Sequence, residues 1–161
     1  MAFLFSFVPS WQIAVAELCK KAMKKLLHTN PYPFLLCRLI TGLIFLSEGI
    51  QKFIWPDEVG AGRFSKIGFP DPAFWAHFTG SFEIVCGICV LIGLLTRLAT
   101  IPLLIVMGTA FVTTKIPILT GKGFWPFAHE YRTDFAMTLL LILLLIYGAG
   151  KNSIDQQLSK S

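Results

Sequence analysis

Residues 73–114 read AFWAHFTGSFEIVCGICVLIGLLTRLATIPLLIVMGTAFVTT, and this stretch decides the fold. Its charged residues are Glu83 and Arg97. A hydrocarbon core of about 30 Å takes roughly 20 helical residues to cross, and the stretch holds two such lengths on either side of Thr96 and Arg97. Because a turn this short joins neighbouring helices, we predict two antiparallel membrane-spanning helices.

Two further apolar stretches complete the predicted set. One runs from about Pro33 to Ile54, and the other, FAMTLLLILLLIYGAG, begins near Phe135. The chain is 55% hydrophobic and only 14% charged, with a mean hydropathy of +0.68, whereas a soluble domain carries about 25% charge. We therefore predict an all-α membrane protein, a four-helix transmembrane bundle with its larger loops near 55–72 and 118–132.

Residues 1–30 form a separate predicted unit ahead of the transmembrane domain predicted for 31–161. Their charged and apolar residues fall on different helical faces, as in an amphipathic helix that lies in the membrane interface. A solvated helix packed on a partner protein is the alternative. Each lysine of its basic cluster would add about 1 kcal/mol to binding of anionic lipid. The cluster consists of Lys20, Lys21, Lys24 and Lys25.

The net charge of +5 suggests a nucleic-acid partner at first sight, but its placement does not. The one dense basic cluster directly precedes an apolar span, as a cytoplasmic membrane flank does. With an even number of spans both termini share a side, and that side holds eight of the 14 lysines and arginines. We predict cytoplasmic termini, a lipid bilayer as the main partner, and no nucleic acid.

Charged residues inside the spans are the first candidates for a site. A charge at the bilayer centre costs at least about 2.5–3.5 kcal/mol, so such residues usually face the bundle interior and serve a function. The presence of Glu48 in a span needs no functional role, since it precedes Lys52 by four residues, the order that favours an ion pair along one helix. Glu83 has no local basic partner, so it is either neutral or paired across the bundle. The ligand-pocket candidates are Arg38, Glu48, Lys52, Glu83 and Arg97; no catalytic residue is assigned.

A C-x-x-C motif, Cys86-Gly-Ile-Cys89, lies inside the second span. Soluble redox proteins place this motif at a helix N-terminus, where the dipole favours the thiolate. Here it lies past the middle of a helix, where a disulfide would strain the backbone. We interpret the pair as free thiols packed between helices, with redox chemistry as the alternative. No metal site is predicted, because the histidines do not form a helical metal motif.

Several short motifs follow one another in a characteristic order. They are RLITG at 38–42, EGIQK at 48–52, GFP at 68–70, EIVCG at 83–87, GLLTRLA at 93–99 and GAGKNSID at 148–155. Together they resemble the DoxX family of small bacterial membrane proteins over about residues 34–158. The resemblance implies a four-helix bundle in the bacterial inner membrane and a link to quinone-coupled redox chemistry. Some relatives are subunits of thiosulfate:quinone oxidoreductase, and others associate with oxidative-stress proteins.

Three functional hypotheses follow. The first is a membrane subunit that supports quinone-linked redox or oxidative-stress chemistry, with quinone as the candidate cofactor and with Arg38, Glu48 and Glu83 lining a pocket open to the outer side. The second is a small transporter that couples to protons or cations through Glu83 near the midplane. The third is a non-catalytic scaffold that only recruits a soluble enzyme through the basic N-terminal helix. The candidate protein partners are a soluble redox protein or further copies of this chain in a homo-oligomer. The Glu83 carboxylate is a site residue in both of the first two hypotheses.

Overall fold

The computed structural model describes residues 33–158, and in that part of the chain the regular secondary structure consists of helices joined by short turns and loops. Residues 1–32, with the predicted amphipathic helix and its lysine cluster, lie outside the described residues, as do 159–161. The elements are α2 (Pro33–Ile54), α3 (Ala61–Lys66), α4 (Pro72–Ile92), α5 (Thr96–Ala110), η1 (Phe111–Lys115), α6 (Ile116–Lys122), α7 (Phe124–Tyr147) and α8 (Ile154–Leu158).

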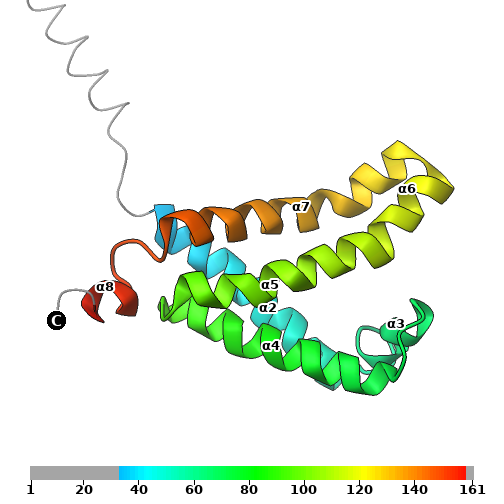
Figure 1. Cartoon of the computed structure of the whole chain (residues 1–161), viewed down its shortest axis with the longest axis horizontal. Helices are drawn as coiled ribbons and strands as arrows, with labels where there is room; N and C mark the ends of the chain where they lie inside the picture. The colour runs from blue at the N-terminus through cyan, green and yellow to red at the C-terminus, as the bar shows by residue number, and fades with distance from the viewer. Residues whose placement is uncertain (1–32, 159–161) are drawn as a thin grey trace, which may run out of the picture. The chain divides into compact units, whose positions relative to one another are not determined.

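The helices form two hairpins that pack side by side (Figure 1). The first hairpin is α2 and α4, with the short α3 in the connection between them. The second is the continuous run α5–η1–α6 and the returning α7. Because α4 also packs on α5 and α7 also packs on α2, the four long segments close into a ring. The buried apolar core inside that ring includes Phe45, Val90, Leu103, Leu141 and Leu144.

Glycines set the distance between α2 and α4. A Cβ atom added at Gly49 would lie 2.8 Å from the carbonyl oxygen of Gly80, and one added at Gly87 would lie 3.1 Å from that of Gly42. The two backbones therefore touch at two places seven residues apart on each helix. Small residues are what allow membrane helices to pack this closely.

The turn between α4 and α5 is as tight as the sequence predicts. Helix α4 ends at Ile92 and is followed by Gly93, whose φ of 71° lies in the left-handed region that glycine adopts without strain. Leu95 follows with a φ of 47°, and α5 begins at Thr96. Chain reversal within three residues makes α4 and α5 antiparallel neighbours.

A π-helical segment, η1, interrupts the third long helix. Pro117 has no N–H group, and its ring crowds the carbonyl four residues earlier, at Thr113. The hydroxyl of Thr113 in turn donates to the carbonyl of Thr109 at 2.8 Å, a contact that also bends helices. Both effects widen the helix here. As a result Lys115 points to the interior and is only 7% exposed.

The predicted loop at 118–132 is wrong, because α6 and α7 fill it with helix. Gly123 alone separates them, with a φ of 87°. Helix α7 therefore begins at Phe124, well before the predicted start near Phe135. Aromatic rings stack along this added part of the helix, where the Phe127 and Tyr131 ring centroids lie 5.3 Å apart. A search for apolar stretches finds only the part of a helix that contacts lipid. It therefore missed the first half of α7, which is amphipathic.

Three helical segments within residues 33–158 are long and apolar enough to cross a membrane: Phe34–Ile54, Pro72–Ile92 and Thr96–Lys122. Helix α7 has 24 residues, but its first half carries Glu130, Arg132 and Asp134. The described residues thus confirm an all-α membrane protein with three such helices. A fourth crossing by α7 stays a prediction.

Candidate functional site

Arg38 binds backbone carbonyls at the end of the bundle where α8 lies. Its side chain is buried, and its two terminal nitrogens donate to the carbonyl oxygens of Ala149 at 3.1 Å, Leu91 at 3.2 Å, and Asn152 at 3.3 and 3.4 Å. These carbonyls belong to the end of α4 and to the loop after α7. Arg38 thus fastens the C-terminal loop to the first hairpin.

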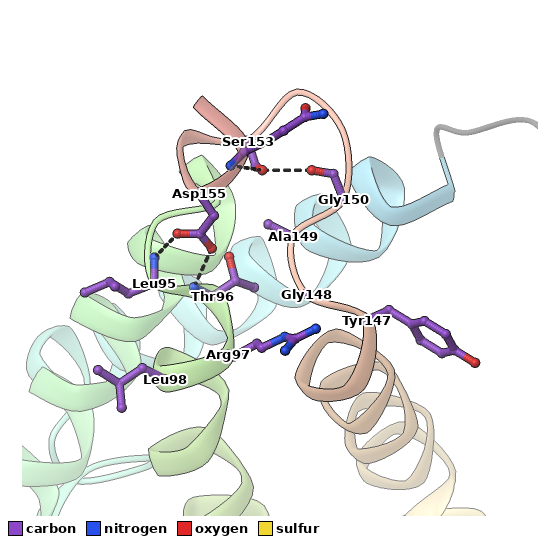
Figure 2. Close-up of a pocket in the computed structure, with 11 residues that line it drawn as sticks. Leu95, Thr96, Arg97, Leu98, Tyr147, Gly148, Ala149, Gly150, Ser153 and Asp155 are labelled. Carbon is purple, nitrogen blue, oxygen red and sulfur yellow. Dashed lines mark hydrogen bonds between the residues drawn. The ribbon is translucent and has the colours of Figure 1, made fainter. Parts of the chain in front are cut away.

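Asp155 caps α5 from the far end of the chain (Figure 2). Its carboxylate accepts hydrogen bonds from the N–H groups of Leu95 at 2.6 Å and Thr96 at 3.0 Å. Leu95 has no side chain that could cap the helix itself, so Asp155 supplies the missing acceptor. Arg97 donates to the carbonyl of Ile146 at 2.9 Å, which joins α5 to the end of α7. We call Arg38, Arg97 and Asp155, with the main chain they hold, the clasp.

The clasp accounts for two of the predicted pocket residues. A hollow of about 450 Å³ lies beside it, lined in part by Arg97 and Asp155. Arg38, Arg97 and Asp155 each bind main-chain groups, although the buried Nε of Arg38 has no partner among the described residues. The role of the clasp in that part of the chain is to join helix ends. Arg38 and Arg97 lie away from Glu48, Lys52 and Glu83, with Arg38 about 21 Å from Lys52 along α2.

A larger cavity of about 670 Å³ lies at the other end, between the two hairpins. One part of its wall is aromatic: Phe45, Phe64, Phe69, Trp75 and Phe78. Another part is charged: Glu48, Lys52, Arg63, Glu83, Lys115, Glu130 and Asp134. Volumes of about 300–1,000 Å³ are typical of small-molecule sites, as is an apolar wall with a few placed polar groups.

An ion pair between Lys52 and Glu83 forms the charged wall on the first hairpin. The lysine nitrogen lies 2.5 Å from a Glu83 carboxylate oxygen, and the two residues are 9% and 3% exposed. Of the two alternatives for Glu83, the structure has the pair across the bundle. In Glu48, the residue one helical turn earlier, Lys52 contacts the backbone carbonyl at 3.4 Å and not the carboxylate. The Glu48 carboxylate lines the cavity without a hydrogen bond or ion pair to any described residue.

A second ion pair, on the second hairpin, was not among the predicted site residues. The nitrogen of Lys115 lies 3.1 Å from the Asp134 carboxylate and donates to the Glu130 carbonyl at 3.0 Å. Lys115 and Asp134 each stand just outside a predicted span, since the stretch 73–114 ends one residue before Lys115 and the last span begins near Phe135. Pro117 after a run of threonines is the signal that could have indicated an irregular helix there, with Lys115 turned inward.

A closely packed apolar layer separates the cavity from the clasp. Leu103, Leu141, Leu144 and Val90 are 0% exposed, and each lies further along its helix toward the clasp than the cavity residues do. Cys86 is buried in the same core, and Cys89 packs against it. Both are free thiols, and neither lines the cavity.

The fold and the cavity define a class: an all-helical integral membrane protein in which two ion pairs, each with a buried lysine, line one cavity. The DoxX family pattern matches residues 34–116, about half of the chain, and the chain belongs to the DoxX family. It is 48% identical over 167 residues to an uncharacterised membrane protein of Mycobacterium tuberculosis, covering 99% of this chain and 95% of that one.

Two other relatives are more distant. A protein of Bacillus subtilis with the provisional name oxidoreductase CatD is 32% identical over 122 residues, covering 75% of this chain and 83% of that one. An uncharacterised protein of Haemophilus influenzae is 28% identical over 141 residues, covering 86% and 99%. No solved structure was found to match this chain.

Proposed function

We propose that this chain is a membrane subunit that binds a quinone in the cavity and so supports quinone-linked redox chemistry. The observation that carries the proposal is the wall of the 670 Å³ cavity, which combines aromatic side chains with two buried lysines. A quinone ring is flat and largely apolar, and its carbonyl oxygens accept hydrogen bonds. Aromatic faces suit such a ring, and ammonium groups donate to its oxygens.

The membrane arrangement in this proposal has four crossings. Helix α7 supplies the fourth, since it is about 36 Å long at 1.5 Å per residue and packs along both α5 and α2. The termini face the cytoplasm of a bacterial inner membrane, and the cavity opens on the opposite side. Lys20 and its neighbours then lie beside the anionic inner leaflet.

The electrons in this proposal are exchanged with a soluble redox partner, while this chain holds the carrier in the membrane. The oxidoreductase name of the Bacillus subtilis relative supports a redox role. Transport would need a path through the apolar layer around Leu103 and Leu141, which are fully buried. For that reason we propose binding in the cavity rather than passage through the bundle.

Replacing Glu83 with glutamine is expected to remove most of the quinone that the purified protein retains. The neutral amide keeps an acceptor oxygen but removes the charge that faces Lys52 at 2.5 Å, so the buried ammonium is left without its counter-charge and is held less firmly. Loss of one partner of a buried pair costs about 3–5 kcal/mol. Quinone is measured by solvent extraction and chromatography after solubilisation in mild detergent.

Glu58→Gln is the matched control, because Glu58 is exposed and is absent from the cavity wall. Retention by this variant should equal that of the natural chain. The proposal fails if the natural chain carries no quinone after mild extraction and takes none up when it is added.

The double replacement Cys86→Ala with Cys89→Ala is expected to leave quinone retention unchanged. The thiols pack in the core, outside the cavity wall, so their loss removes packing and costs about 1 kcal/mol of stability. Thermal unfolding in detergent and quinone extraction measure the two effects separately. Loss of quinone without loss of stability would instead favour the thiol redox alternative.

A further inference from the structure

The same arrangement of charges occurs in both hairpins. In the first, Lys52 near the end of α2 pairs with Glu83 on the returning α4. In the second, Lys115 at the end of η1 pairs with Asp134 on the returning α7. Both lysines are buried, at 9% and 7% exposure, and both pairs line the same cavity. The cavity therefore receives one lysine–carboxylate pair from each half of the bundle.

The hydrogen bonds of the two lysines also match. Lys52 donates to the Glu83 carboxylate at 2.5 Å and to the Glu48 carbonyl at 3.4 Å. Lys115 faces the Asp134 carboxylate at 3.1 Å and donates to the Glu130 carbonyl at 3.0 Å. An ammonium group has three N–H donors. Among the described residues, each lysine thus has one donor that the protein does not use, in a cavity large enough for a ligand.

We infer that the cavity is a two-point site for a flat ring with two opposed carbonyl oxygens, a 1,4-dione, with one oxygen bound by Lys52 and the other by Lys115. The inference rests on the proposed quinone site and specifies how the ring is held. Trp75 and Phe78 line the same cavity and offer aromatic faces to the ring.

The charges around the cavity disfavour an anionic ligand at these lysines. Each ammonium already has a carboxylate partner. Three cations, Arg63 included, line the wall against four carboxylates, which are Glu48, Glu83, Glu130 and Asp134. A ligand carboxylate or phosphate would be repelled by these groups. A neutral carbonyl oxygen can use the remaining N–H donor without displacing Glu83 or Asp134.

The test compares a dione with a matched single ketone. Full-length protein in nanodiscs is titrated with 2-methyl-1,4-naphthoquinone and with 2-methyl-1-tetralone, and binding is measured by equilibrium dialysis. Each ion pair is removed whole, as Lys52→Met with Glu83→Leu and as Lys115→Met with Asp134→Leu. Removing both partners leaves no bare buried charge, so the helices stay folded. Lys122→Met with Glu58→Leu is the control, since both residues are exposed and outside the cavity wall.

Each paired removal should weaken binding of the dione about tenfold, because a hydrogen bond from a charged donor is lost. Removing both pairs should weaken it about a hundredfold, since separated sites contribute additively. The ketone should bind the natural chain about tenfold more weakly than the dione does. Its affinity should change by less than about twofold when one pair is removed, since the other lysine can serve its single oxygen.

A dione that depends on one lysine pair and ignores the other overturns the two-point site but leaves the quinone proposal standing. Equal affinity of the natural chain for the dione and the ketone does the same. A natural chain that binds neither compound overturns the two-point site and the proposed function together.

Discussion

Replacing Arg38 with methionine is expected to lower the free energy of unfolding by about 4 kcal/mol. Arg38 is 3% exposed, and its guanidinium makes four hydrogen bonds to the carbonyls of Leu91, Ala149 and Asn152. Hydrogen bonds from a charged group contribute about 1.5–3 kcal/mol each, and a buried carbonyl left unpaired costs about 1–3 kcal/mol. Water has partial access to the loop and can satisfy some of these carbonyls, so the expected loss of stability is smaller than the added hydrogen-bond terms.

The change is measured by thermal unfolding in detergent, followed by limited proteolysis of the segment after Tyr147. Arg132→Met is the control, because Arg132 is exposed and binds only His129, at 3.2 Å, among the described residues. Arg38→Lys should fall between the two, since an ammonium cannot reach all three carbonyls at once. If Arg38→Met is as stable as the control, the clasp does not stabilise the bundle.

Gly87→Leu is expected to destabilise the bundle by at least about 3 kcal/mol, through separation of α2 from α4. A Cβ atom at this position would already lie 3.0 Å from the backbone nitrogen of Leu46 and 3.1 Å from the carbonyl oxygen of Gly42. Backbone atoms cannot rotate away, so the helices must move apart along their whole contact. The Lys52–Glu83 pair bridges the same two helices and should be lost with it.

Gly108→Leu is the matched control. It makes the same change within a long helix, but an added Cβ would meet nothing within 4 Å there. The two variants are compared by the fraction that elutes as a monodisperse peak in mild detergent and by the unfolding midpoint. Gly87→Ala should cost less than Gly87→Leu, because only one carbon must be accommodated. Equal behaviour of Gly87→Leu and Gly108→Leu would contradict the close contact.

The long apolar helices were predicted well, because a membrane span can be recognised from the composition of its own residues. The predicted first span and the observed α2 share the bounds Pro33–Ile54. A tight turn between the second and third spans was also predicted, but around Thr96 and Arg97; in the structure it lies at residues 93–95, and α5 begins at Thr96. The first half of α7 was missed because it carries charged residues, and a search for apolar stretches does not extend into such a segment.

The site was predicted in part, since the structure brings Glu48, Lys52 and Glu83 to one cavity and Arg38 and Arg97 to the clasp. A charge within a span indicates that a partner exists, but not whether the partner is a ligand or a helix end. For Arg38 the partners are carbonyls left open by helix ends, which no local pattern reveals. Lys115 was missed because its direction depends on the π-helical segment.

The clasp also bears on how the chain is made in the cell. Arg38 is synthesised early, yet its acceptors at Ala149 and Asn152 follow 111 and 114 residues later. The cap on α5 must likewise wait for Asp155. During synthesis Arg38 thus has only the Leu91 carbonyl among its final acceptors, and α5 begins with open N–H groups. Packing of the two hairpins is therefore completed only when residues 149–155, which follow all four long helical segments, have been made. A chain cut short before Ala149 should be recognised by membrane quality-control proteases as unfinished.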